Sequence, residues 1–158
     1  MTRYLHPRPL TSDAFAAFGT VVETAGRPSE PANAGTADRF PLAVVEHRGP
    51  ATTGISIFRS RRPPGAVRAH TLERHMLGTQ AFVPLQRRPW LVVVAADPGN
   101  PVCFSAQGDQ GVQYGIAVWH HPLLVLAPEQ DFLVVDRLGP EPDLDQVAID
   151  PAFEIRGA

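Results

Sequence analysis

Short β-branched runs, separated by turn-forming residues, set the strongest limit on how this chain can fold. Strand-like runs fall at residues 42–47, 54–59, 79–85, 90–95, 102–105, 118–121, 123–127 and 132–136. Turn signals such as Asp97-Pro98-Gly99-Asn100 separate these runs. Many short strands about ten residues apart are typical of β-sandwiches and barrels, and the 17 prolines disfavour long helices. The sequence therefore predicts an all-β fold, a barrel or jelly-roll sandwich with one or two short helices.

The remaining segments fit around such a core. A short helix is expected after the N-cap candidates Thr11-Ser12-Asp13, closed by Gly19, with a strand following at residues 20–23. Residues 24–40 are rich in Pro, Gly, Ala and Asn and are expected to form a long loop. The tail, residues 138–158, is expected to wrap the domain or a partner subunit. A length of 158 residues fits a single domain over residues 1–158.

Composition excludes several classes of function. The formal net charge of −2 comes without a basic stripe, which argues against a nucleic-acid partner and against a membrane surface. No apolar run approaches the roughly 20 residues of a membrane span, and the first residues lack the apolar core of a signal peptide, so we expect a cytoplasmic protein. The single Cys103 excludes an intrachain disulfide. All 14 basic residues are arginine, so a lysine Schiff base is excluded.

Histidines concentrate in two places. The stretch Ala69–Pro84 combines two histidines with a glutamate, an arginine and a glutamine, and then runs into an apolar segment. The second place is Trp119-His120-His121-Pro122. Polar groups this dense beside a buried strand are hard to explain as surface alone. We expect the two segments to meet in one pocket, with plain packing and surface polarity as the alternative.

The first segment has the spacing of a metal-binding motif. Glu73 and His75 point to the same side of an extended segment, and a bend at residues 77–79 can return Gln80 to that face. Glu-x-His-x4-Gln matches the spacing of the first cupin motif, usually His-x-His-x4-Glu. With His120 from a later strand, Glu73, His75 and Gln80 can supply the ligands of a divalent metal. A metal-free polar pocket is the competing hypothesis.

The same residues are candidates for proton transfer. His120 and His121 are adjacent, so in a strand they face opposite ways and at most one enters the barrel. An imidazole there can act as acid or base near neutral pH, as can His75. Glu73 can orient a histidine or act as a base. Tyr114 can donate to a developing oxyanion, or simply pack.

Several further polar residues are candidates for substrate binding. Arg59 closes a strand and Arg74 lies between two site candidates, and either guanidinium can grip a carboxylate with two hydrogen bonds or remain solvated. Gln80, His70 and Asn33, the last from the long loop, complete the expected contacts with a small carboxylated substrate.

The motifs as a group resemble the ureidoglycolate lyase family. They are Leu72-Glu73-Arg74-His75-x-Leu77-Gly78-Thr79-Gln80, Gly111-Val112-x-Tyr114, Val118-Trp119-His120-His121-Pro122 and Phe132-Leu133-Val134-Val135-Asp136-Arg137. The resemblance covers most of the chain. It implies a cupin-like β-barrel, a homodimer, and cleavage of ureidoglycolate to urea and glyoxylate in allantoin breakdown. It leaves the cofactor open between none and a divalent metal, for which nickel is sometimes named.

One departure from the family pattern keeps other functions open. Family members commonly carry a histidine and a basic residue after the tyrosine of the Gly-Val-Asn-Tyr motif, whereas this chain reads Gln113-Tyr114-Gly115-Ile116-Ala117. The alternatives are therefore a related cupin enzyme acting on another small hydroxy or oxo acid, and a non-catalytic cupin that binds a small acid.

Overall fold

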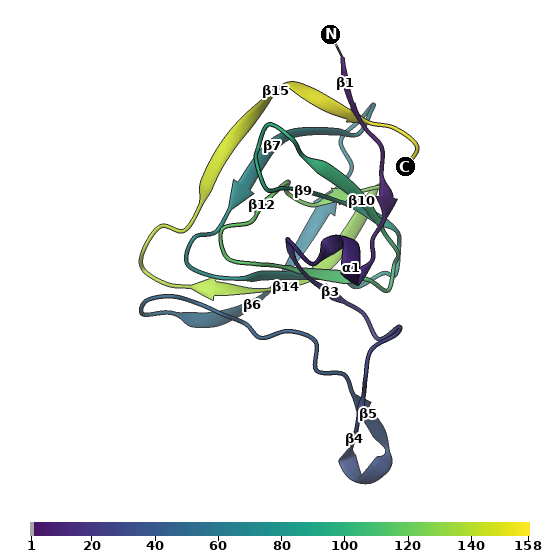
Figure 1. Cartoon of the computed structure of the whole chain (residues 1–158), viewed down its shortest axis with the longest axis vertical. Helices are drawn as coiled ribbons and strands as arrows, with labels where there is room; N and C mark the ends of the chain where they lie inside the picture. Colours follow the sequence, from purple (N-terminus) through teal and green to yellow (C-terminus); the bar gives the residue numbers. More distant parts are fainter. Residues whose placement is uncertain (1) are drawn as a thin grey trace.

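Two β-sheets curl around a common interior. The structure, a computed structural model, describes residues 2–158. The larger sheet has the order β1 (Arg3–Leu5), β15 (Asp145–Ile155), β7 (Arg68–Arg74), β12 (Trp119–His120), β9 (Trp90–Ala95), β10 (Val102–Ala106), β2 (Arg8–Pro9), and β13 (Leu124–Val125) also pairs with β9. The second sheet has the order β3 (Gly19–Val22), β11 (Gly111–Tyr114), β8 (Gln80–Pro84), β14 (Glu129–Leu138), β6 (Thr52–Arg61). Figure 1 shows the sheets facing each other, which confirms the predicted all-β, cupin-like fold.

Alternating side chains build the interior. On β8, Gln80, Phe82 and Pro84 are buried while Ala81 and Val83 are only half-buried, so one face of this strand lines the core. The central strand β9 is buried on both faces. Its residues Trp90, Val92 and Val94 pack in the cluster between the sheets, and Leu91, Val93 and Ala95 pack in a second cluster with residues of β1 and β15.

The short helix forms where the sequence predicts it. Helix α1 (Ser12–Phe15) begins after Thr11, whose hydroxyl accepts a hydrogen bond from the Ala14 N–H at 3.2 Å. Phe15 is fully buried and meets the edge of the Phe104 ring at a centroid distance of 5.8 Å. The helix therefore covers the apolar end of the barrel. No helix within residues 2–158 is long and apolar enough to cross a membrane.

One segment that is expected to be a strand is not one. Residues 42–47 form no regular strand: only His47 makes an isolated bridge, with Gly78. The segment instead lies against the outside of the second sheet, where Thr79 Oγ1 accepts from the Glu46 N–H at 3.0 Å and Gln113 Nε2 donates to the Val44 carbonyl at 3.1 Å. Its apolar residues cover part of the outer face of the sheet without adding a strand to it.

The long loop and the tail both contain strands. Within residues 24–40, β4 (Glu30–Ala32) and β5 (Ala37–Arg39) form a hairpin around the short 3₁₀ turn η1 (Asn33–Gly35), and this hairpin projects from the body (Figure 1). The tail wraps the domain itself, because β15 pairs with β7 on one side and with β1 on the other. Its register shifts between Ala148 and Phe153, which breaks the alternation that would reveal a strand.

Candidate active site

Glu73, His75 and His120 meet inside the barrel. Glu73 is near the end of β7 and pairs in register with His120 on β12, so the two strands bring their side chains together. The Glu73 carboxylate oxygen lies 3.7 Å from His120 Nε2, and the rings of His75 and His120 stack with centroids 5.7 Å apart. One potential ligand atom from each of the three residues lies within 4.8 Å of the others. The two histidine-bearing segments therefore do meet in space.

Hydrogen bonds define the orientation of both imidazoles. His75 Nδ1 lies 2.8 Å from the Asp143 carbonyl oxygen, and His120 Nδ1 lies 2.9 Å from the Val118 carbonyl oxygen. Because a carbonyl oxygen only accepts, each Nδ1 carries the proton and each neutral ring has its lone pair on Nε2. Both Nε2 atoms are buried and have no hydrogen-bond partner among residues 2–158. The site thus presents two unused nitrogen lone pairs beside a carboxylate.

This arrangement fits a divalent metal. Metal-binding histidines generally donate their second ring N–H to a carbonyl or carboxylate, as both imidazoles do here. A carboxylate and two imidazole nitrogens form a ligand set suited to transition metals. Glu73, His75 and His120 are therefore a possible metal-binding triad. Gln80 is a neighbouring donor: its Nε2 donates to Asp136 Oδ2 at 3.3 Å, and its buried Oε1 has no partner within the described chain.

Tyr114 completes the inner wall of the cluster. Its ring stacks on His120 with a centroid distance of 4.0 Å and an interplanar angle of 9°. Burial lowers the pKa of His120 to about 4, so this imidazole is neutral at pH 7. Burial first, and the Glu73 carboxylate second, raise the pKa of Tyr114 well above its ordinary value. The phenol therefore keeps its proton.

The second member of the histidine pair lies elsewhere. His121 follows His120 along the chain and faces the other way, where its Nε2 lies 3.4 Å from His70 Nδ1. The two rings meet edge to face at a centroid distance of 4.9 Å. Burial, with a smaller contribution from His70, lowers the pKa of His121 to about 4. The structure therefore groups His70 with His121 and apart from the triad.

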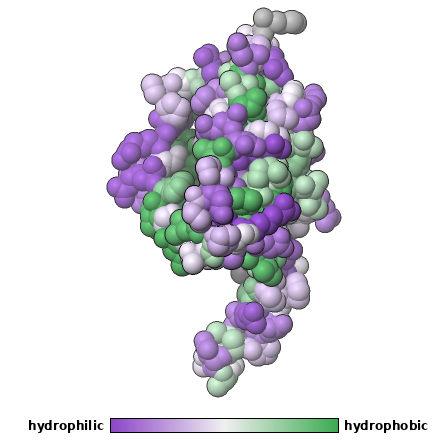
Figure 2. All heavy atoms as spheres, turned by 90° about the vertical axis from the view of Figure 1, so that its left-hand side faces the viewer, coloured by the Kyte–Doolittle hydropathy of each residue, from purple (hydrophilic) through white to green (hydrophobic). Residues whose placement is uncertain are grey.

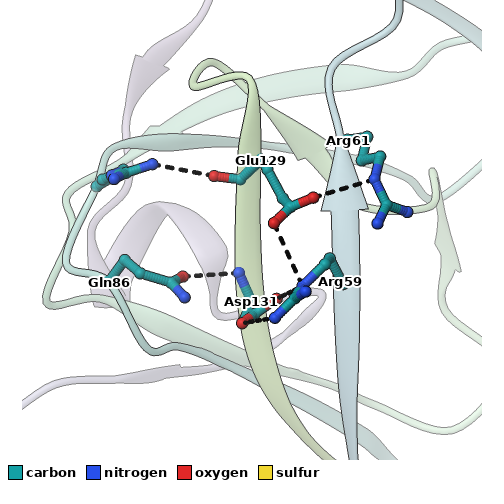
Figure 3. Close-up of polar contacts among 6 residues, drawn as sticks. Arg59, Arg61, Gln86, Glu129 and Asp131 are labelled. Atoms are coloured by element: carbon teal, nitrogen blue, oxygen red, sulfur yellow. Dashed lines mark hydrogen bonds and ion pairs between the residues drawn. The ribbon is translucent and has the colours of Figure 1, made fainter.

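Arg74 and Asn33 are also held apart from the triad, whereas Arg59 borders the same cavity as Glu73 but is bound by a carboxylate on the outer face. Phe58 faces the interior and packs on Phe82, so the next residue, Arg59, points to the outer face of β6. Figure 3 shows its guanidinium gripped by Asp131, with Nε–Oδ1 and Nη2–Oδ2 distances of 2.7 and 3.0 Å. Arg74 donates to Asp145 Oδ2 at 3.0 Å and lies over the Trp119 ring. Asn33 is at the tip of the projecting hairpin.

Two cavities border the cluster. A polar cavity of about 310 Å³ is lined by His75, Gln80, Asp136, Arg137 and Asp143, together with neighbouring residues. A smaller and more apolar cavity of about 230 Å³ is lined by Phe58, Arg59, Ser60, Glu73, Phe82, Pro122 and Leu123. His75 and Glu73 of the triad thus border different cavities.

Sequence reasoning missed the acidic residues around the polar cavity. Asp136 appears in the sequence only as part of the motif Phe132–Arg137, and Asp143 lies in the Pro-rich tail. The signal available for Asp136 was its place at the end of an inward-facing series on β14, after the buried Phe132 and Val134. Asp143 had no comparable signal, because it follows no strand or motif.

The two buried histidines predict a stability that depends on pH. Their pKa values lie near 4 in the folded protein against an ordinary 6.5, so the unfolded chain binds more protons between these values. The free energy of unfolding should therefore fall as the pH drops from about 6.5 to about 4, by an amount on the order of a few kcal/mol for both residues. Denaturant midpoints measured across this range check the prediction, and His121→Gln should flatten the slope. A free energy that does not change over this range would contradict the burial of both rings.

A cupin-like β-barrel that holds a carboxylate–histidine cluster at the border of small cavities defines a class of small-molecule-binding barrels. This chain belongs to the ureidoglycolate lyase family, because the family model described as ureidoglycolate lyase matches residues 2–156. A protein from Brucella melitensis named ureidoglycolate lyase is 48% identical, over 87% of this chain and 85% of its own length. Ureidoglycolate lyase 1 from Rhizobium meliloti is 45% identical over 98% of this chain and 95% of its own. The Rhizobium etli ureidoglycolate lyase is 43% identical over 99% and 98%.

Proposed function

We propose that this chain is a ureidoglycolate lyase, which cleaves ureidoglycolate to glyoxylate and urea. The relatives named for this activity supply the substrate class. The observation that carries the proposal is the pair of buried Nε2 atoms of His75 and His120, which have no hydrogen-bond partner among residues 2–158 and lie beside the Glu73 carboxylate. Breaking a carbinolamide needs a group that takes a proton and then returns it, and this cluster holds groups of that kind.

The reaction requires only proton transfers by side chains in the cluster. In the proposed step, His120 Nε2 takes the proton of the substrate hydroxyl, the carbon–oxygen double bond of glyoxylate forms, and the carbon–nitrogen bond breaks. The same proton then passes to the leaving nitrogen and completes urea, so the enzyme is unchanged. Glu73, 3.7 Å from His120 Nε2, stabilises the imidazolium between the two transfers. His75 is the alternative base, since it has the same tautomer.

Gln80 is suited to bind the ureido group. Asp136 can only accept, so it holds the amide nitrogen of Gln80 at 3.3 Å and leaves Oε1 as an acceptor without a partner in the described chain. The ureido group offers N–H donors that satisfy such an oxygen. Leaving a buried acceptor unpaired costs about 1–3 kcal/mol, so a substrate without these donors is disfavoured.

A divalent metal is an alternative to these proton transfers, because an imidazole whose Nε2 lone pair binds an ion cannot also take a proton there. Glu73, His75 and His120 would hold the ion, with Gln80 Oε1 as a further ligand. The ion would polarise oxygen atoms of the substrate as a Lewis acid. Elemental analysis of the purified protein tests this part, and stoichiometric metal that is lost on Glu73→Ala would support it. Protein without metal that retains full activity would exclude it.

The direct test is release of urea and glyoxylate from ureidoglycolate by the purified protein, with and without added divalent metals. Turnover that follows protein concentration supports the proposal, and no turnover under any condition contradicts it.

A second function, action on another small hydroxy or oxo acid, is favoured by the departure at residues 115–117. There the Ala117 N–H donates to the His75 carbonyl at 2.7 Å, and the three uncharged residues leave the segment without the basic group of the family pattern. A panel of such acids in the same assay separates the two functions.

We also propose that the chain forms a homodimer through the outer face of the second sheet. Val44, Ile55 and Ile57 are 74%, 75% and 55% exposed, which is unusual for aliphatic side chains. Apolar side chains are exposed on the lower body, next to the projecting hairpin (Figure 2). The β4–β5 hairpin projects on this side, where it would contact a second copy (Figure 1). Ile55→Arg should shift the protein to monomer in sedimentation equilibrium, whereas Leu144→Arg should not. A monomeric wild type would contradict the proposal.

A further inference from the structure

We propose that Asp143 is a positioning residue that fixes the tautomer and the orientation of His75. The inference rests on the proposed function for the importance of His75, but its geometric part can be tested without any activity. Asp143 lies between β14 and β15, 68 residues after His75 in the chain. The fold nevertheless places the two in direct contact.

Asp143 contacts the segment around His75 twice. Its main-chain carbonyl oxygen lies 2.8 Å from His75 Nδ1, and its carboxylate oxygen Oδ1 accepts a hydrogen bond from the Leu77 N–H at 2.6 Å. The carboxylate contact is charge-assisted and short, as expected for a strong hydrogen bond. Because one residue supplies both acceptors, the side-chain contact sets the place of the carbonyl that holds the imidazole.

The loop that carries Asp143 is fastened on both sides. Before it, Arg137 Nη2 donates to Glu141 Oε2 at 2.7 Å, and the Arg137 side chain is only 3% exposed. After it, Arg74 Nε donates to Asp145 Oδ2 at 3.0 Å, where β15 starts its pairing with β7. Asp143 is thus the middle of three contacts, and it alone reaches the imidazole.

The ring of His75 depends on this contact for its direction. Its main chain is fixed separately, because the Ala117 N–H donates to the His75 carbonyl at 2.7 Å. The ring nitrogen Nε2 has no partner within residues 2–158, so Nδ1 is the only ring atom that a hydrogen bond holds. The carbonyl of Asp143 requires Nδ1 to carry the proton, which leaves the Nε2 lone pair facing the cluster. A partner of this kind commonly affects metal affinity or activity about 10- to 100-fold.

The experiment compares Asp143→Ala, Asp143→Asn and the control Asp145→Asn with wild type by ¹⁵N NMR of the histidine rings at pH 8. Wild type should show a proton on Nδ1 of His75. Asp143→Ala should mix the two tautomers and lower kcat for urea release about 10-fold or more, as for other partners of this kind. Asp143→Asn keeps an acceptor for the Leu77 N–H. This variant should therefore have nearly the wild-type His75 tautomer and nearly the wild-type kcat. Asp145→Asn removes only the negative charge from the Arg74 contact and should leave the His75 tautomer as in wild type.

The outcomes separate this inference from a purely structural role and from the proposed function. If Asp143→Ala lowers the melting temperature but keeps the wild-type tautomer and kcat, Asp143 only closes the loop and the inference is wrong. If wild type has its proton on Nε2 of His75, the inference fails even if no variant folds. If wild type cleaves no ureidoglycolate but the tautomer responds as described, the positioning role holds and the proposed function fails.

Discussion

His120→Gln should lower kcat/KM for urea release by about 10²- to 10⁴-fold, the range expected for loss of a group that transfers protons. His120 is 1% exposed, and its Nε2 lies 3.7 Å from the Glu73 carboxylate. Glutamine has a similar length and can still donate to the Val118 carbonyl, but its amide nitrogen has no lone pair to accept a proton. The substitution should therefore lower kcat strongly while changing the stability of the protein little.

His121→Gln is the matched control for this variant. The two residues are adjacent, have the same chemistry, and are both buried, yet His121 faces His70 and not the triad. Its replacement should leave kcat/KM close to wild type. Denaturant midpoints of both variants show whether a loss of activity reflects unfolding. If His121→Gln lost activity and His120→Gln retained it, the wrong histidine of the pair would have been assigned to the site.

Phe132→Ala should destabilise the protein by about 3–5 kcal/mol, as for other large-to-small changes of a buried phenylalanine. Phe132 is fully buried on β14, and its ring meets Trp90 of the opposite sheet at a centroid distance of 4.9 Å and an angle of 66°. The side chain thus joins the two sheets at the centre of the barrel. Its removal leaves a cavity that the strands cannot close without losing their pairing.

Phe58→Ala is the control for this change in stability. Phe58 contacts Phe82 at 6.0 Å between ring centroids, but its residue is 44% exposed, so its removal leaves less of a void. Guanidinium denaturation followed by tryptophan fluorescence gives both free energies, and the loss for Phe132→Ala should be clearly larger. Equal losses would show that the interior is not organised around the contact between Phe132 and Trp90.

The type of fold could be predicted from the sequence because strand alternation and turn residues are local signals. The run at residues 90–95 became the central strand β9, and Thr11 became the N-cap of α1. Residues 42–47 have the same β-branched composition, but whether they join a ladder depends on which edge is free. Their place against the sheet is decided by side chains of Thr79 and Gln113, which lie far away along the chain.

The meeting of the candidate residues was predictable where they share a strand or a motif. Glu73 and His75 are two residues apart, and the period of a strand is enough to bring their side chains to one face. The choice between His120 and His121 needed the register of β12 against β7, which pairs His120 with Glu73. The arginines were ambiguous for the same reason: Arg59 has the right chemistry, but alternation after Phe58 directs it to Asp131 on the outer face.

Contacts that depend on the path of loops could not be predicted from the sequence. Asp143 reaches His75 only because β15 returns along β7 and carries the preceding loop over the end of that strand. Nothing in the local sequence of a Pro-rich tail indicates such a contact. The same holds for Asp136, whose importance depends on the amide of Gln80 and not on its own neighbours in the sequence.

A crystal structure of the protein with bound glyoxylate tests the account most directly, because glyoxylate is a product of the proposed reaction and is small enough for either cavity. We expect the hydrate of glyoxylate, whose hydroxyl groups can donate to a ring-nitrogen lone pair, within hydrogen-bonding distance of His120 or His75 Nε2, beside the Glu73 carboxylate. Glyoxylate bound instead between His70 and His121, or on the outer face at Arg59, with both Nε2 atoms still unpaired, would contradict it.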